Sequence, residues 1–297
     1  MLSTPESDLD LYCRVKEDYF TILQDIVRID SPSGEEMALS EHICARYSNG
    51  QWHGEVDETG NISFTPTDRI EEERLPLLNA HIDTFPVRQD RHQIAQEEQA
   101  KKLACPDFLR LHDGGVTKAE EIQAGFDDKA GVALILYLMH HTDLRFRAIL
   151  TVQEEKAVSG KPSYGRSGGF GIEEAMKNHP EFFRAALWTI IVDRENRNDI
   201  IDMYGKEDSP LQPRIRLCSQ DFTDWLVKIS ADAGYPMEVT RGKMGDAYNI
   251  RRAFPDLDVV NLSCGYYRDH KPDECLKIDE TLSIMRIVEM CIRERGN

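Results

Sequence analysis

The feature that most constrains the fold is the alternation, from residue 75 onward, of uninterrupted apolar segments with helical ones. Mainly apolar strands are predicted over residues 75–80, 146–153, 185–192 and 259–264, and a further strand over residues 237–240. Helices are predicted between or after them, over residues 129–140, 172–177, 222–233 and 279–293. Strands that are apolar throughout are buried on both faces. We therefore expect an α/β fold with three α/β/α layers and a mixed, mostly parallel central sheet.

The segment before residue 75 carries three local signals. Residues 15–28 place their apolar side chains on one helical face. Ser33 and Glu36 have the spacing of a capping box, which predicts a helix that begins there and runs to about Tyr47. Residues 56–65, with Gly60-Asn61 among them, are typical of a β-hairpin.

Charge and hydropathy exclude two kinds of partner. The formal net charge is −17, so binding to nucleic acid is not expected. No apolar run approaches the ~18 residues that a membrane span needs, so no membrane partner is expected. The densest acidic run, Glu71-Glu72-Glu73, is interpreted as a solvated face, with a cation-attracting surface as the alternative.

The cysteines and the N-terminal sequence indicate the compartment. The seven cysteines are scattered, and no CxxC pair occurs among them. Reduced thiols are the simplest interpretation of this pattern. The first residues, MLSTPESDLD, are acidic and polar, unlike a signal or transit peptide. We therefore expect a cytoplasmic protein.

Ionisable side chains collect where the predicted strands end and where one helix starts. In chain order they are His81 with Asp83, Asp127 with Asp128, Glu154 with Glu155, Asp193, and His270. Ligand sites in such sheets lie at the carboxyl ends of the strands, so we expect these side chains to meet. Two imidazoles and several carboxylates suit a pair of borderline divalent cations such as zinc.

Each of these residues also has an ordinary structural interpretation. A single His-x-Asp or Glu-Glu is usually a solvated pair, and Asp127-Asp128 before a helix is a typical N-cap. Asp193 and His270 are each consistent with a surface loop. Their joint occurrence at strand ends favours a single site.

Five segments carry a family resemblance when they are taken together. They are Asn79-Ala80-His81-Ile82-Asp83-Thr84, Gly125-Phe126-Asp127-Asp128-Lys129-Ala130-Gly131, Val152-Gln153-Glu154-Glu155, Asp193, and His270-Lys271-Pro272-Asp273-Glu274. As a set they resemble the co-catalytic zinc peptidases, which include aminopeptidase, peptidase T-like and glutamyl aminopeptidase-like families and related amidohydrolases. The match runs from Ser31-Pro32-Ser33-Gly34 to the last helix.

The resemblance implies a role for each matched residue. The metal ligands would be His81, Asp127, Glu155, Asp193 and His270. Asp127 would bridge two metals, and Asp193 would bind the metal opposite Glu155. Asp83 would orient the imidazole of His81, and Glu154 would be the general base. The implied cofactors are two divalent ions, zinc in the first place, with Co²⁺ or Mn²⁺ as alternatives. The family also has a cis peptide after the bridging aspartate, here Asp127-Asp128.

The chain departs from the peptidase T-like and glutamyl aminopeptidase-like patterns because no inserted lid or dimerisation domain is visible. Only 46 positions separate His81 from Asp127, and residues 93–102 there are polar and helical in pattern. The 77 positions from Asp193 to His270 are filled by predicted strands and helices of the catalytic domain itself. We therefore expect residues 1–297 to form a single catalytic domain.

Two further segments are candidate walls of the site. Gly245-Asp246-Ala247-Tyr248-Asn249 resembles the Gly-Thr/Ser-Asp-Ala loop of the family, near the substrate. Residues 159–171 are rich in Gly and Ser and follow Glu155, which is consistent with a mobile loop over the site or with a plain surface loop.

The function implied by the resemblance is hydrolysis of an amide bond by a water that two metals activate. An aminopeptidase acting on small peptides is favoured, because without a lid the free amine is the group that acidic residues such as Glu195 or Asp246 can recognise. A deacylase of N-acyl substrates and a binding protein that has lost the chemistry are the alternatives. The sequence leaves oligomeric state and side-chain preference open.

Overall fold

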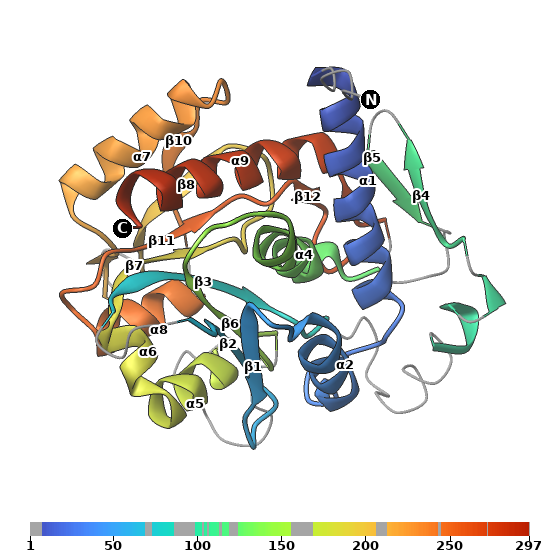
Figure 1. Cartoon of the computed structure of the whole chain (residues 1–297). Helices are drawn as coiled ribbons and strands as arrows, with labels where there is room; N and C mark the ends of the chain where they lie inside the picture. The colour runs from blue at the N-terminus through green and yellow to red at the C-terminus, as the bar shows by residue number, and fades with distance from the viewer. Residues whose placement is uncertain are drawn as a thin grey trace.

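A nine-stranded mixed sheet forms the centre of the part of the chain that the structure describes (Figure 1). The computed structural model describes residues 8–296 except 69–72, 86–98, 103, 106, 113–114, 119–123, 156–168, 206–212, 243–244 and 272. The strand order is β1-β2-β6-β3-β7-β11-β8-β10, with β9 paired to β8. These strands are β1 (Trp52–Val56), β2 (Ile62–Pro66), β3 (Leu75–His81), β6 (Arg147–Thr151), β7 (Ala186–Ile191), β8 (Asp199–Tyr204), β9 (Ile215–Arg216), β10 (Glu238–Arg241) and β11 (Val259–Leu262).

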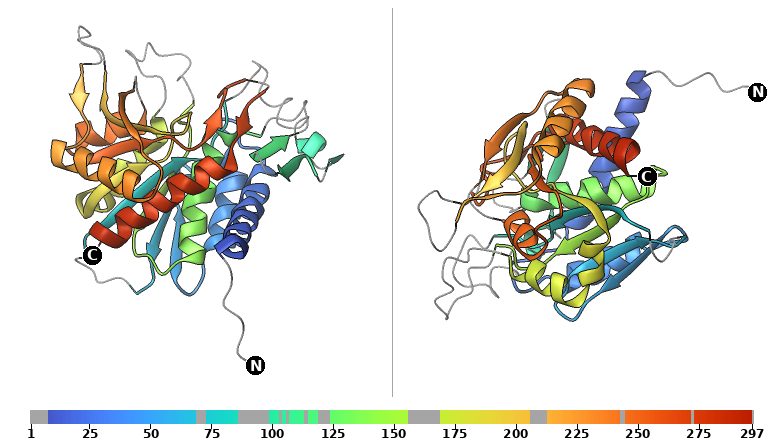
Figure 2. Two further views of the ribbon diagram at one scale, coloured as in Figure 1. Left: turned by 90° about the horizontal axis from the view of Figure 1, so that it is seen from above. Right: turned by 90° about the vertical axis from the view of Figure 1, so that its left-hand side faces the viewer.

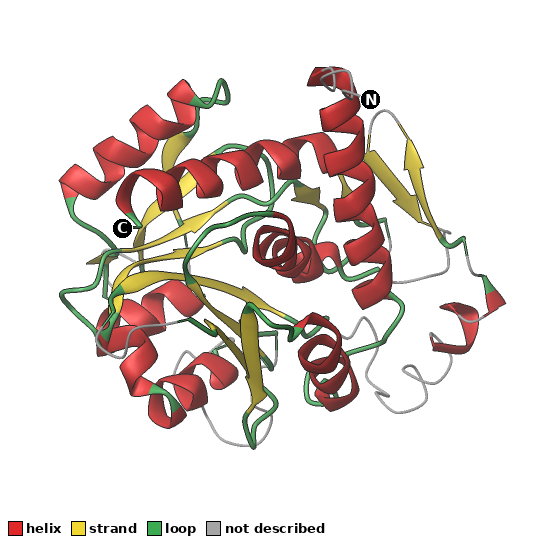
Figure 3. Ribbon diagram, in the orientation of Figure 1, coloured by secondary structure: helices red, strands yellow, loops and turns green. Residues whose placement is uncertain are grey.

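The central strands β6, β3, β7 and β11 run parallel to one another. Nearly all of their residues are buried, which is why the sequence is mostly apolar there. The pairs β2–β6 and β11–β8 are antiparallel, so the expected α/β fold with a mixed sheet is confirmed. A second sheet of four short strands, in the order β12-β13-β5-β4, lies beside it (Figure 3). Its strands are β4 (Leu109–His112), β5 (Gly115–Lys118), β12 (Tyr266–Tyr267) and β13 (Cys275–Leu276).

Helices cover both faces of the large sheet (Figure 2). One hydrophobic core joins the sheet to α1 (Asp8–Val27), α2 (Met37–Tyr47), α4 (Phe126–His141), α7 (Gln220–Asp232) and α9 (Ile278–Arg295). A second core on the other face contains α5 (Phe170–Asn178), α6 (Pro180–Arg184) and α8 (Asp246–Ala253). No helix in the described ranges is both long enough and apolar enough to cross a membrane.

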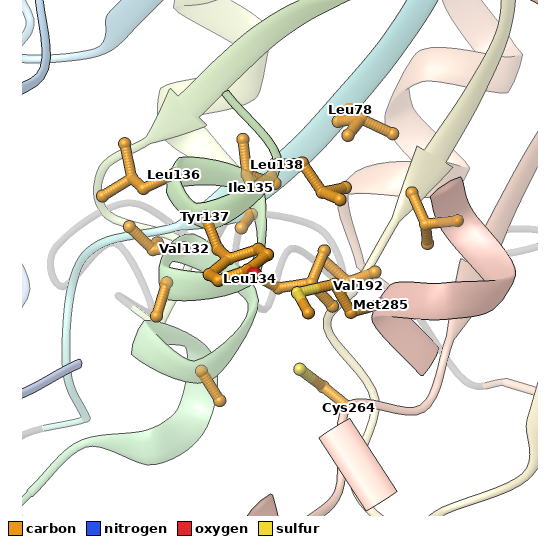
Figure 4. Packing of buried hydrophobic residues seen from close by; sticks show 14 of the residues in the cluster. Leu78, Val132, Leu134, Ile135, Leu136, Tyr137, Leu138, Val192, Cys264 and Met285 are labelled. Atoms are coloured by element: carbon orange, nitrogen blue, oxygen red, sulfur yellow. The ribbon is translucent and has the colours of Figure 1, made fainter. Parts of the chain in front are cut away.

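Helix α4 is the most deeply buried of these helices and positions part of the site. Its side chains pack against Leu78 of β3, Val192 after β7 and Met285 of α9 (Figure 4). A helix surrounded in this way has apolar residues on every side, which explains why its sequence shows no amphipathic stripe. Its first turn is irregular: Asp127 and Asp128 have non-helical backbone angles, and the peptide bond between them is cis, as expected.

Most predicted elements are confirmed, but the capping box is wrong. Glu36 is the residue before α2, and no side-chain hydrogen bond caps that helix. Instead the hydroxyl of Ser33 donates to Oδ2 of Asp83 at 2.7 Å, and the carboxylate of Glu36 accepts a hydrogen bond from Gln153 N at 3.1 Å. Both residues of the local motif therefore serve tertiary contacts.

The sequence analysis also missed several elements. Strand β8, helices α6 and α8 and the four-stranded sheet were not predicted. Parts of three predicted features lie outside the described residues. They are residues 71–72 of the acidic run, residues 93–98 of the expected helical pattern, and residues 159–168 of the Gly- and Ser-rich segment.

Candidate metal centre

The candidate site lies at one edge of the large sheet, where three neighbouring parallel strands end. His81 is the last residue of β3, Glu154 and Glu155 follow β6, and Asp193 follows β7. Because β6, β3 and β7 are adjacent and parallel, their carboxyl ends meet at the same edge. The first turn of α4 brings Asp127 to this edge, and the segment after β12 brings His270.

The carboxylate of Asp127 lies between the two imidazoles. Its Oδ1 is 3.2 Å from Nε2 of His81, and its Oδ2 is 3.2 Å from Nε2 of His270. A carboxylate that offers one oxygen to each side has the geometry of a bridging ligand.

Each imidazole also has a second carboxylate of its own. Nε2 of His81 is 3.6 Å from Oδ1 of Asp193, and Nε2 of His270 is 2.5 Å from Oε1 of Glu155. The structure thus brings together two pairs of potential ligands, His81 with Asp193 and His270 with Glu155, each pair beside one oxygen of Asp127. These five residues are the ones that the resemblance implied as ligands.

Asp83 is buried beneath the site and accepts hydrogen bonds from several groups. Its Oδ1 is 3.3 Å from Nδ1 of His81, so it can fix the orientation and tautomer of that ring. Its two oxygens also accept hydrogen bonds from the backbone amides of Glu154 at 2.9 Å and Glu155 at 3.0 Å. Asp83 therefore links the histidine to the Glu-Glu turn.

Four residues that the sequence analysis did not single out also hold the site. Glu274 accepts hydrogen bonds from the backbone amides of Gly125 at 3.1 Å and Asp127 at 2.8 Å. The hydroxyl of Tyr266 donates a hydrogen bond to Oδ1 of Asp193 at 3.1 Å. The ring of Phe85 stacks on the ring of His270, with 4.3 Å between the two ring centroids. Asn261 accepts a hydrogen bond from Asp193 N at 3.0 Å and donates to its carbonyl at 2.7 Å. Of these four, only Glu274 lay in a recognised motif, and there no role was attached to it.

The electrostatics of the cluster fit divalent cations. Burial raises the pKa of Glu155 to about 8, with the charge of Asp127 adding to the shift. Burial alone lowers the pKa of His270, but the carboxylates of Asp127 and Glu155 outweigh it and raise the value to about 10. Burial and the charge of Asp193 raise the pKa of Glu154 well above its usual range. More carboxylates than cations are buried together here, and bound cations relieve such an excess of negative charge.

Asp246 lies near the same edge, at the start of α8, and has an unusual carboxylate. It is 2% exposed, and its Oδ2 accepts a hydrogen bond from the hydroxyl of Thr151 at 3.0 Å. Its Oδ1 is buried without a hydrogen-bond partner in the described part of the chain. Burial and the neighbouring charge of Asp193 raise the pKa of Asp246 to about 7. Glu195, the other acidic residue considered for amine recognition, lies beside Asp269.

The geometry defines an α/β protein with a buried histidine and carboxylate cluster at the edge of its sheet. No family model matches the chain, and no curated protein matches its sequence. Solved structures do match. Aminopeptidase PepT from Bacillus cereus aligns with a TM-score of 0.70 at 13% identity, over 94% of this chain and 98% of that one.

Two further structures give the same result. An aminopeptidase from the archaeon Desulfurococcus kamchatkensis aligns with a TM-score of 0.65 at 14% identity, over 95% of this chain and 96% of that one. Aminoacylhistidine dipeptidase from Vibrio alginolyticus aligns with a TM-score of 0.61 at 11% identity, over 92% of this chain and 96% of that one. At these identities the likeness concerns the fold, and it confirms that the chain has the fold expected from the zinc-peptidase motifs.

Proposed function

We propose that this protein is a metal-dependent hydrolase that cleaves an amide bond, and specifically an aminopeptidase that acts on small peptides. The observation that carries the proposal is the position of Asp127, whose two carboxylate oxygens each face a different imidazole. Each imidazole has its own second carboxylate, Asp193 or Glu155. This donor set suits two zinc ions, and Co²⁺ or Mn²⁺ are alternatives.

In this proposal the five ligands are His81, Asp127, Glu155, Asp193 and His270. Two bound cations would lower the pKa of a water molecule held between them and stabilise negative charge on the substrate oxygen. Glu154 is the general base that takes the proton of the attacking water and donates it to the leaving amine. Asp83 fixes the His81 ring and both backbone amides of the Glu-Glu turn.

Recognition of the substrate's free amine is assigned to acidic groups, with Asp246 in the first place. Its buried Oδ1 lacks a partner in the described residues, and a buried acceptor without a donor costs free energy. The ammonium group of a peptide N-terminus would supply both the missing donor and a compensating charge. The N-acyl substrate of a deacylase has no free ammonium group and could not supply this donor. The aminopeptidase is therefore favoured.

We further propose that residues 1–297 form a single catalytic domain without a lid. Strands β8, β10 and β11, which lie between Asp193 and His270 in the chain, pair within the large sheet. A cytoplasmic location is proposed from the cysteines, all of which are unpaired. Peptide or amide is the only substrate class proposed, with no nucleic-acid or membrane partner.

The proposal is tested by loading the chain with zinc or cobalt, measuring metal content, and assaying free-amine and N-acylated peptides in parallel. We expect about two bound metal ions per chain and cleavage of the free-amine series. Cleavage of N-acyl substrates alone would support the deacylase, and full metal loading with no hydrolysis of either series would support a binding protein. Absence of stoichiometric metal would overturn the proposed centre.

A further inference from the structure

The Glu154–Glu155 turn is held by an unusual set of contacts. Four consecutive backbone amides, those of residues 152 to 155, each donate a hydrogen bond to a side-chain oxygen. Val152 N donates to Asn61 at 3.1 Å and Gln153 N donates to Glu36 at 3.1 Å. The next two amides donate to the two oxygens of Asp83 at 2.9 and 3.0 Å.

The three acceptor residues come from separate parts of the chain and are all buried. Glu36 precedes α2, Asn61 precedes β2, and Asp83 follows β3. Their exposed fractions are 3%, 3% and 0%. Since the three buried side chains flank separate helices and strands of the core, they hold the path of the backbone after β6.

Gln153 is the residue of the turn at which such fixing is needed most. Its φ is 54°, in the left-handed region that a residue with a Cβ rarely adopts. This conformation separates the end of β6 from Glu154 and so decides where the next two side chains point. The contact that holds it is the hydrogen bond from Gln153 N to Oε1 of Glu36, an oxygen that also accepts from Gly34 N at 2.5 Å.

We infer that Glu36 is a positioning residue: its carboxylate holds Gln153 in the left-handed conformation and thereby places Glu154 and Glu155 in the site. Among the described residues, the hydrogen bond that joins Glu36 to the site comes from the backbone of Gln153, so Glu36 is assigned no part in proton transfer or metal binding. The inference about catalysis rests on the proposed hydrolase function, whereas the inference about the backbone does not.

The backbone is tested first, by hydrogen exchange of the metal-free chain followed by mass spectrometry of the peptide that contains residues 152–155. In Glu36→Ala the amide of Gln153 loses its acceptor, and we expect its exchange to accelerate at least ~10-fold. Glu41→Ala, an exposed change five residues further along in helix α2, is the control and should leave exchange of this peptide unchanged. Equal exchange in the two variants would overturn the inference, whether or not the chain is a hydrolase.

Activity then separates positioning from general stabilisation. Glu36→Ala should lower kcat at least ~10-fold at unchanged KM, because small displacements of catalytic groups cost that much. Glu36→Gln keeps an oxygen acceptor and should stay within about threefold of the wild type. Equal losses in the Gln and Ala variants would contradict the assigned role.

A second-site change gives the sharpest test. Glycine adopts positive φ without steric cost, so Gln153→Gly removes the need for the Glu36 contact. In the wild type, Glu36→Ala is expected to reduce kcat at least ~10-fold. In the Gln153→Gly background, the same change should reduce kcat by less than about threefold. If the loss caused by Glu36→Ala is as large in the Gln153→Gly background as in the wild type, the conformation of Gln153 is not the link and the inference fails.

Discussion

Gly131, in the second turn of α4, offers a test of the packing that places Asp127 in the site. A Cβ atom added at Gly131 would lie 2.5 Å from the carbonyl oxygen of Val192 and 2.5 Å from Oδ1 of Asp128. Neither atom can move freely. The carbonyl oxygen of Val192 belongs to the backbone. Oδ1 of Asp128 accepts a hydrogen bond from Gly131 N, and Oδ2 of the same carboxylate accepts one from His81 N.

Two opposing effects decide the outcome of Gly131→Ala. Inside a helix, alanine is favoured over glycine by about 1 kcal/mol. Forcing a methyl group into a packed core costs about 1–3 kcal/mol, and two fixed contacts at 2.5 Å place this site at the upper end. We therefore expect a net loss of about 2 kcal/mol in the free energy of unfolding. Because α4 must shift away from β7, Asp127 should move as well and metal affinity should fall.

The assay is urea denaturation of the metal-free protein, followed by metal titration of the folded variant. Gly50→Ala is the control, since a Cβ there has nothing within 4 Å, and it should leave both measurements unchanged. A Gly131→Ala variant as stable as the wild type, or more stable, would refute the reasoning, because helix propensity would then outweigh the contacts at α4.

Three further predictions address the proposed chemistry and the fold. Glu154→Gln should retain both metals and lose at least ~100-fold in kcat, whereas Glu155→Ala should lose metal; identical behaviour of the two variants would contradict the division of roles. Removal of metal by a chelator should abolish hydrolysis and lower the Tm by roughly 10 °C, with recovery on adding zinc; an unchanged Tm would argue against a structural contribution of the metals. Burial raises the pKa of the Cys218 thiol to about 12. At pH 8, Ellman's reagent should therefore modify the exposed Cys13 in the folded chain and leave Cys218 intact. Equal rates of modification at the two cysteines would contradict the burial of Cys218.

Much of the fold could be predicted from the sequence because burial leaves a direct trace in it. Strands β3, β6 and β7 are mostly apolar and lack the alternation of a half-exposed strand, since helices cover both of their faces. The ionisable residues that follow them could be assigned to one edge because parallel strands share their carboxyl ends. The same reasoning fails for β8, whose sequence DIIDMY carries an aspartate at two of its positions and lacks an apolar run. It also fails for the four-stranded sheet, whose strands are only two to four residues long.

What the tertiary structure alone decided is the support around the site. Ser33 and Glu36 have the spacing of a helix cap, and by local rules they should bond to their own helix. In the folded chain they bond instead to Asp83 and to Gln153, the second of which lies 117 positions away from Glu36. Glu274 likewise binds the amide of Asp127 across 147 positions. Sequence spacing reports which residues are neighbours along a helix or strand, whereas these contacts depend on how separate elements pack, and a buried carboxylate pairs with whichever unsatisfied donor that packing brings within reach.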